Sequence, residues 1–154
     1  MLALLHLRND TASSFILLIW IITLTVFSDI GGYIFGRIFK GKKISKISPN
    51  KTVSGMIGSF LFSILSVFFI SFLIGTLSGL ENNFFLKSKY FILALLFSFA
   101  AQFGDLFISY FKRLEKIKDT GKILPGHGGI FDRIDGLMFV VILGYILYTL
   151  EIFP

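Results

Sequence analysis

The sequence predicts an all-α integral membrane protein, a polytopic helical bundle with about four transmembrane helices. Apolar residues make up 55% of the 154 residues, and only 16% are charged. The mean hydropathy of +0.83 is too high for a water-soluble domain, which has to cover its surface with polar groups. The segment 52–80 carries no charged residue at all. It is longer than the ~20 apolar residues that cross a bilayer.

Four apolar stretches are expected to form the spans, at 14–39, 55–76, 90–111 and about 131–150. Each is expected to be helical, because in lipid a single unclosed chain must satisfy its backbone hydrogen bonds internally. The residues before position 14 read as a short lead-in to the first span. The sequence therefore predicts one membrane domain over 1–154.

The basic residues predict the orientation of this bundle. Of the 15 Lys and Arg residues, six follow the first span (37–51) and six follow the third (112–133). Positively charged loops stay on the cytoplasmic side of a membrane. We therefore expect cytoplasmic loops at about 40–54 and 112–130, with both termini outside. In a bacterium the membrane would be the inner, or cell, membrane.

Composition excludes some classes of function. The chain has no Cys, so it can form neither disulfides nor a Cys-ligated metal site. Its net charge of +6 is accounted for by loops that set topology and contact anionic lipid, so no nucleic-acid partner is expected.

Two acidic residues, Asp29 and Asp105, interrupt otherwise apolar spans. Each lies seven or eight residues before the first basic residue of its cytoplasmic loop, which places both at a similar depth of roughly 10–12 Å. A carboxylate facing lipid costs several kcal/mol, so both are expected to face the bundle interior or a wet cavity. A structural hydrogen bond and an ion path are alternative roles for them. The glycines beside Asp29, at 31, 32 and 36, predict close helix packing.

The segment 109–135 has the parts of a metal–phosphate site. Its Pro-Gly-His-Gly-Gly turn leads into the fourth span, and free N–H groups at a helix start bind anions. Asp132 and Asp135 are three residues apart and so share one helix face, and Asp105 on the neighbouring span could meet Asp132. Carboxylates gathered in this way favour Mg²⁺, which leaves coordination positions for substrate phosphates.

The same segment resembles the signature of the phosphatidate cytidylyltransferases. The matching residues are Ser109, Lys112, Arg113, Lys118, Asp119, the run 124–129, Asp132, Arg133 and Asp135. The stretches 48–52 and 104–106 also resemble the family, as do Asp29, Tyr33 and Gly36. The resemblance implies transfer of a cytidylyl group from CTP to phosphatidic acid, which gives CDP-diacylglycerol and pyrophosphate. It also implies Mg²⁺ with a monovalent cation such as K⁺, and a homodimer.

The resemblance implies a role for each matching residue. Catalytic roles would fall to Asp105, Lys118, Asp119, His127, Asp132, Arg133 and Asp135, with Asp105 and Asp132 as the metal ligands. Substrate would be bound by Ser48, Lys51, Thr52, Ser109, Lys112, Arg113, Gly126, Gly128 and Gly129. His127 is a candidate general base, but a phosphate hydrogen bond or a contact within the turn is the favoured role. No strong base is needed, because the lipid phosphate is already nucleophilic at neutral pH.

Two departures from the family leave other functions open. Its members are usually longer, with extra membrane helices before the part seen here, and Val53 and Ser54 stand where an aromatic residue and a Glu are typical. An inactive truncated remnant of the enzyme is therefore one alternative. A transport or ion-conducting subunit that uses Asp29 and Asp105 is another, although it gives the glycine turn no role.

Overall fold

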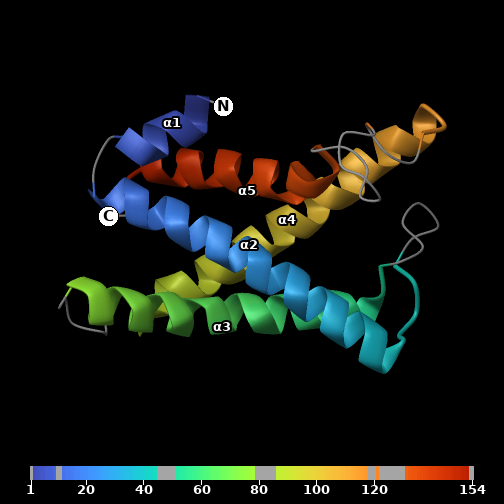
Figure 1. Ribbon diagram of the computed structural model, residues 1–154, viewed down its shortest axis with the longest axis horizontal. Helices are drawn as coiled ribbons and strands as arrows, with labels where there is room; N and C mark the ends of the chain where they lie inside the picture. The colour runs from blue at the N-terminus through green and yellow to red at the C-terminus, as the bar shows by residue number, and fades with distance from the viewer. Residues whose placement is uncertain are drawn as a thin grey trace.

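The computed structural model describes residues 2–9, 12–44, 51–78, 86–117, 121 and 131–152. Helices account for most of them (Figure 1): α1 Leu2–Asn9, α2 Ala12–Phe39, α3 Val53–Ser78, α4 Ser88–Leu114 and α5 Phe131–Thr149. Within these ranges the chain forms no strand, only an isolated bridge between Lys43 and Thr52. The predicted all-α membrane fold is therefore confirmed.

Among the described residues, three helices are long and apolar enough to cross a membrane: Ser14–Phe39, Val53–Thr76 and Ser88–Leu114. The fourth predicted span corresponds to α5, whose apolar part, Ile134–Thr149, is shorter than the other three. The residues before α2 are not simply a lead-in, because α1 is a separate helix that contacts both α2 and α5. Its Leu7 is fully buried.

The ends of the long helices gather at the two ends of the bundle (Figure 1). The C-terminal ends of α2 and α4 lie with the N-terminal ends of α3 and α5 at one end of the bundle. The described basic residues at these helix ends, within 40–44 and 112–117, therefore lie on the same side, as the alternation of charge along the sequence predicts. We call this the basic end.

The aromatic core lies toward the opposite end of the bundle. Trp20 of α2 contacts Tyr90 and Phe97 of α4 edge to face, with ring centroids 5.7 Å apart in both pairs. All three side chains are fully buried. Such pairs contribute about 0.5–1.5 kcal/mol each beyond the area that they bury. The core therefore fixes α2 against α4 and leaves the basic end for polar groups.

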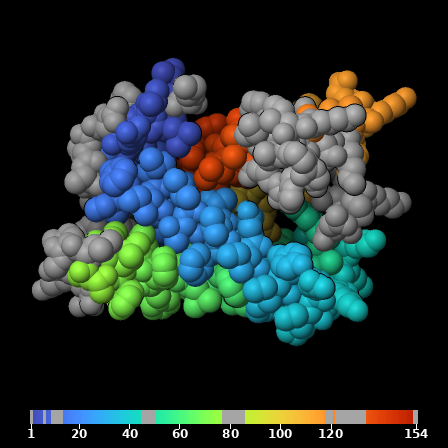
Figure 2. Space-filling view, in the orientation of Figure 1, coloured from blue at the N-terminus to red at the C-terminus, as the bar shows by residue number. Residues whose placement is uncertain are grey.

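The outward surface of α2 is apolar. Ile22, Val26 and Ile30 repeat every four residues and are all exposed. They form a stripe along one side of the helix, as expected for a surface in contact with lipid. In the space-filling view, α2 runs across the visible face with α3 beside it (Figure 2).

Glycines bring α2 and α3 into direct backbone contact. A Cβ atom on Gly58 would lie 2.5 Å from the carbonyl oxygen of Gly31, and one on Gly55 would lie 2.8 Å from that of Gly32. Neither approach is open to a residue with a side chain. The close packing predicted from the glycines of the first span is thus confirmed, and α3 of the same chain occupies this face. The predicted homodimer stays a prediction.

Replacing Gly58 by Val is expected to destabilise the bundle by about 2 kcal/mol or more, because the added methyl groups would separate α2 from α3. Thermal unfolding in detergent, followed by circular dichroism, measures the effect. Ile57→Phe is the matched control, since it adds bulk at the neighbouring position, which is 51% exposed. Equal melting temperatures for the two variants would contradict the backbone contact.

Candidate active site

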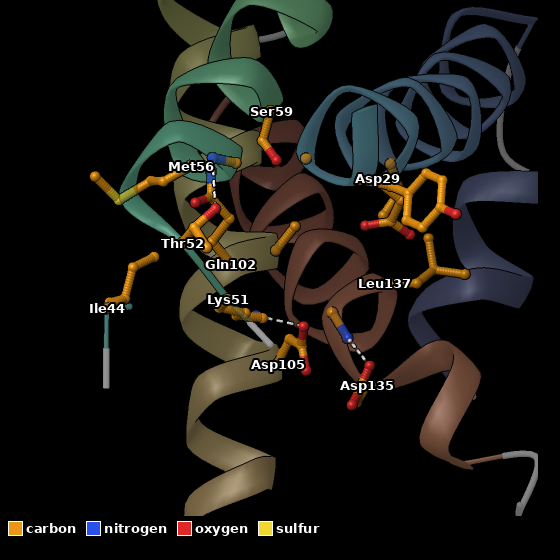
Figure 3. A pocket seen from close by; sticks show the side chains of 16 residues that line it. Asp29, Ile44, Lys51, Thr52, Met56, Ser59, Gln102, Asp105, Asp135 and Leu137 are labelled. Carbon is orange, nitrogen blue, oxygen red and sulfur yellow. Dashed lines mark hydrogen bonds and ion pairs between the residues drawn. The ribbon is translucent and has the colours of Figure 1, made fainter. Parts of the chain in front are cut away.

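A pocket of about 390 Å³ lies between α2, α3, α4 and α5 near the basic end (Figure 3). This is within the usual size of small-ligand sites, ~300–1,000 Å³. Its lining residues are Thr25, Asp29, Gly32, Tyr33, Ile44, Lys51, Thr52, Gly55, Met56, Ser59, Ala101, Gln102, Asp105, Asp135, Gly136 and Leu137. The pocket therefore joins the first predicted cytoplasmic loop to the two helices that flank the second.

Three carboxylates from three different helices line this pocket. Asp29 comes from α2, Asp105 from α4 and Asp135 from α5. Asp105 and Asp135 are neighbours in the pocket, and Asp29 lies within the range of electrostatic interaction with both. The prediction that Asp29 and Asp105 face a wet cavity is confirmed, since both line the pocket and both remain open to water: Asp29 is exposed, and the Asp105 side chain is 37% exposed.

Two lysines pair with two of the carboxylates. The Lys51 ammonium group forms an ion pair with Asp105, which Figure 3 shows at the mouth of the pocket. The Lys112 Nζ atom lies 3.6 Å from Asp135 Oδ2, and these two side chains are only 10% and 12% exposed. Because the second pair is largely shielded from water, its charges interact more strongly than those of a surface pair.

The turn before α3 positions Lys51. The Ile44 amide donates to the Lys51 carbonyl at 3.0 Å, and the Val53 amide donates to the Lys42 carbonyl at 2.9 Å. The Thr52 hydroxyl oxygen then accepts the Gly55 amide at 3.1 Å, as a capping residue does at the start of a helix. These bonds hold Lys51 one residue ahead of the cap, where it faces α4.

Asp135 is positioned by the glycine that follows it. The Gly136 amide donates to Asp135 Oδ1 at 2.9 Å. A Cβ atom on Gly136 would lie 3.0 Å from the carbonyl oxygen of Ala101, so α5 approaches the backbone of α4 closely here. Since Ala101 is one turn before Asp105, this contact brings the two carboxylates side by side.

A buried polar network joins three helices below the carboxylates. The Ser28 and Ser98 hydroxyl groups are 3.0 Å apart, and Ser59 donates to the Ser28 carbonyl at 2.8 Å. The Gln102 amide also donates to the Ser98 hydroxyl at 3.3 Å. Hydrogen bonds between membrane helices contribute about 0.6 kcal/mol each on average. Ser59 and Gln102 line the pocket, so the network also fixes two of the side chains that surround it.

Some predicted site residues lie in or beside the pocket, and others do not. Lys51, Thr52, Asp105 and Asp135 line it, while Lys112 reaches it through Asp135. Arg113, on the last turn of α4, is exposed and donates to the Ile117 carbonyl at 3.4 Å. Ser109 lies half-buried on the same helix, outside the pocket lining.

The remaining predicted residues cannot be placed around the pocket. Asp132 and Arg133 lie in the first turn of α5, and the structure describes their backbone only. Seven others lie outside the described residues: Ser48, Lys118, Asp119, Gly126, His127, Gly128 and Gly129. The pairing of Asp105 with Asp132 as metal ligands stays a prediction, since the described neighbour of Asp105 on α5 is Asp135.

The sequence reasoning missed Gly136 and two uncharged polar residues of the pocket, Thr25 and Gln102. Thr25 precedes Asp29 by four residues, and Gln102 precedes Asp105 by three, so each shares a helix face with a pocket carboxylate. This spacing could have predicted that Thr25 and Gln102 line the same pocket as the carboxylates. Gly136 gave no such signal, because its role depends on a contact with α4.

The described residues fit a divalent cation that shares its coordination sphere with substrate. In this part of the chain, no three Asp, Glu or His side chains come together tightly enough to enclose a metal ion. Mg²⁺ does not need such a cage, since it is usually bound by one or two carboxylates together with water and substrate phosphates. The adjacent carboxylates of Asp105 and Asp135, open to a pocket, supply that arrangement.

The chain is similar to phosphatidate cytidylyltransferases of several bacteria. It is 43% identical to that of Helicobacter pylori (strain J99) over 141 residues, which are 88% of this chain and 48% of the relative. It is 39% identical to that of Rickettsia conorii over 147 residues, 94% of this chain and 61% of the relative. For Staphylococcus epidermidis the identity is 42% over 126 residues, 81% of this chain and 44% of the relative.

The chain thus spans about half the length of the curated relatives that it matches. A sequence model described as the cytidylyltransferase family matches residues 1–151, nearly the whole chain. Together with the apolar helices and the charged pocket between them, this match shows that the chain is an integral membrane protein of the cytidylyltransferase family.

Proposed function

We propose that this pocket is the catalytic site of a phosphatidate cytidylyltransferase. The observation that carries the proposal is the meeting of Asp105 and Asp135 with Lys51 and Lys112 in one pocket at the basic end. The names of the relatives support it. The substrates are CTP and phosphatidic acid, and the products are CDP-diacylglycerol and pyrophosphate.

The reaction joins two anions, so the site has to neutralise charge and align the reacting atoms. An oxygen of the lipid phosphate attacks the α-phosphorus of CTP. The new P–O bond forms as the bond to the β-phosphate oxygen breaks, and pyrophosphate leaves with that electron pair. In this proposal, Lys51 and Lys112 bind phosphate oxygens and stabilise the charge that develops on the leaving group. Their ion pairs with the carboxylates Asp105 and Asp135 support this role.

Asp105 and a carboxylate at the start of α5 would hold Mg²⁺ in this proposal. The sequence favours Asp132 as that second ligand, and Asp135 is the described candidate. The bound ion would neutralise the triphosphate and polarise its α-phosphorus. K⁺ as a further cation, and the nucleotide contacts of the segment 118–129, remain part of the proposal.

The location of the pocket suits both substrates. It lies at the basic end, which the positive-inside rule places in the cytoplasm, where CTP is available. Its walls are membrane helices, so a lipid phosphate at the interface can reach the same site. We propose the bacterial inner membrane as the location, with the active-site loops on the cytoplasmic side.

Activity of this chain is tested directly by product formation. The purified protein, with Mg²⁺, CTP and phosphatidic acid in mixed micelles, is expected to form CDP-diacylglycerol, detected by mass spectrometry. Asp132→Asn is expected to abolish the product, because the second proposed metal ligand is lost. No product across several detergents and lipids would reject catalysis by this chain alone and favour the inactive remnant.

A further inference from the structure

The two carboxylates proposed to bind the cation are each paired with a lysine. Lys51 comes from the turn before α3, and Lys112 from the end of α4. We propose that these two ammonium groups take the place of one divalent cation in the cation-free protein. Binding of the cation then releases both of them toward the substrate phosphates. This inference rests on the proposed function, because it concerns the same cation site.

The net formal charge of the described residues supports this exchange. Asp29, Asp105 and Asp135 with Lys51 and Lys112 give the pocket a formal charge of −1. In that state the pocket repels a phosphate. A divalent cation changes the formal charge to +1 without moving any helix. The site therefore attracts the anionic lipid only after the cation, alone or with the nucleotide, has bound.

The lysines are the partners that can move. Asp135 accepts the Gly136 amide at 2.9 Å, and Asp105 is carried by the helix α4, so the backbone of both carboxylates is fixed beside the pocket. An ammonium group on a four-carbon stem can change direction by rotation of its side chain alone.

The exchange also explains why the lysines reach the site from two different segments. Asp105 lies seven residues before Lys112 on α4, yet its ion pair is with Lys51, and Lys112 pairs across to α5. Each pair thus links different parts of the bundle. In the proposal, Asp105 of α4 and Asp135 of α5 would hold the cation, and the two lysines would be released from two different segments of the chain.

The affinity for Mn²⁺, used as a spectroscopic substitute for Mg²⁺, tests the exchange without any turnover. Free Mn²⁺ is measured by electron paramagnetic resonance in titrations of the purified protein. Lys51→Met is expected to bind Mn²⁺ about tenfold more tightly than the unsubstituted chain, because a competing charge is removed. Lys112→Met should also tighten the binding of Mn²⁺, and the double variant should bind Mn²⁺ more tightly than either single variant. Lys43→Met, in the same turn but exposed, is the control and should leave the affinity unchanged.

Labelling of amines gives a second measurement that needs no substitution. Acetylation of Lys51, followed by mass spectrometry, should rise at least about twofold when saturating Mg²⁺ breaks its ion pair, whereas Lys43 should not respond. Lys51→Arg, which keeps the charge, should stay within about twofold of the unsubstituted affinity for Mn²⁺.

The outcomes separate this inference from the proposed function. Unchanged or weaker Mn²⁺ binding in Lys51→Met overturns the exchange, even if the chain forms CDP-diacylglycerol. Tighter Mn²⁺ binding in a chain that forms no product supports the exchange and rejects catalysis by this chain. Absence of Mn²⁺ binding in all variants overturns the exchange and the cation site together.

Discussion

Asp105→Asn is expected to lower kcat/KM for CDP-diacylglycerol formation by at least about a thousandfold. Asp105 has the central position among the charged groups of the pocket. It pairs with Lys51, lies next to Asp135 and interacts electrostatically with Asp29. An amide of the same shape cannot neutralise a cation and holds the lysine only weakly. The loss should fall mainly on kcat, because charge stabilisation in the transition state is what disappears.

The control for this variant is Glu115→Gln. Glu115 is exposed directly after α4, so it tests the loss of a carboxylate at the same end of the bundle but outside the pocket. It should retain activity within about threefold, since a distant exposed charge is screened. Both variants should melt near the unsubstituted protein. An active Asp105→Asn chain would show that the chemistry lies elsewhere.

The helices of this fold could be predicted from sequence because lipid leaves few alternatives. Each apolar stretch became a helix near its expected bounds, and the backbone contact of α2 with α3 followed from closely spaced glycines. The helix α1 could not be predicted in this way. It has only 8 residues, and it is held by burial of Leu7 rather than by its own length.

The site could be predicted from sequence where a charged residue interrupts an apolar segment. Asp29 and Asp105 stand out because a carboxylate in an apolar helix needs a polar environment. Asp132 and Asp135 share a helix face, and the sequence interpretation chose Asp132 as the partner of Asp105, whereas the described neighbour of Asp105 on α5 is Asp135. The identity of that neighbour depends on the rotation of α5 about its axis, and this rotation is fixed by the approach of Gly136 to the Ala101 carbonyl.

The two ion pairs could not be predicted from spacing. Lys51 and Asp105 are far apart in the sequence, and they meet only because the capped turn before α3 lies beside α4. Charge counting assigned these lysines to topology, and the resemblance assigned them to substrate binding. Neither line of reasoning predicted that Lys51 would pair with Asp105 and Lys112 with Asp135.

Gly136→Val is expected to lower kcat about a hundredfold while the chain remains folded. The Val side chain would collide with the Ala101 carbonyl, since even a Cβ atom lies 3.0 Å from it. The first turn of α5 would then move away from α4 and carry Asp135 with it. Displacement of a catalytic group by about 1 Å is enough for a loss of this size. Steady-state kinetics and thermal unfolding of the same preparations measure the two effects.

Met138→Val controls for the β-branched side chain, because it lies on the same helix with 40% of its surface exposed. It should change kcat by less than about threefold, as expected for a surface position. The kcat of Gly136→Ala should lie between that of the unsubstituted chain and that of Gly136→Val, because a single Cβ atom requires only a small shift of the helix. Adding Ala101→Gly to Gly136→Val should not restore activity, since the collision is with a backbone oxygen that every residue carries. Rescue by that second substitution, or near-normal turnover of Gly136→Val alone, would show that the α4–α5 contact does not set the distance between the two carboxylates.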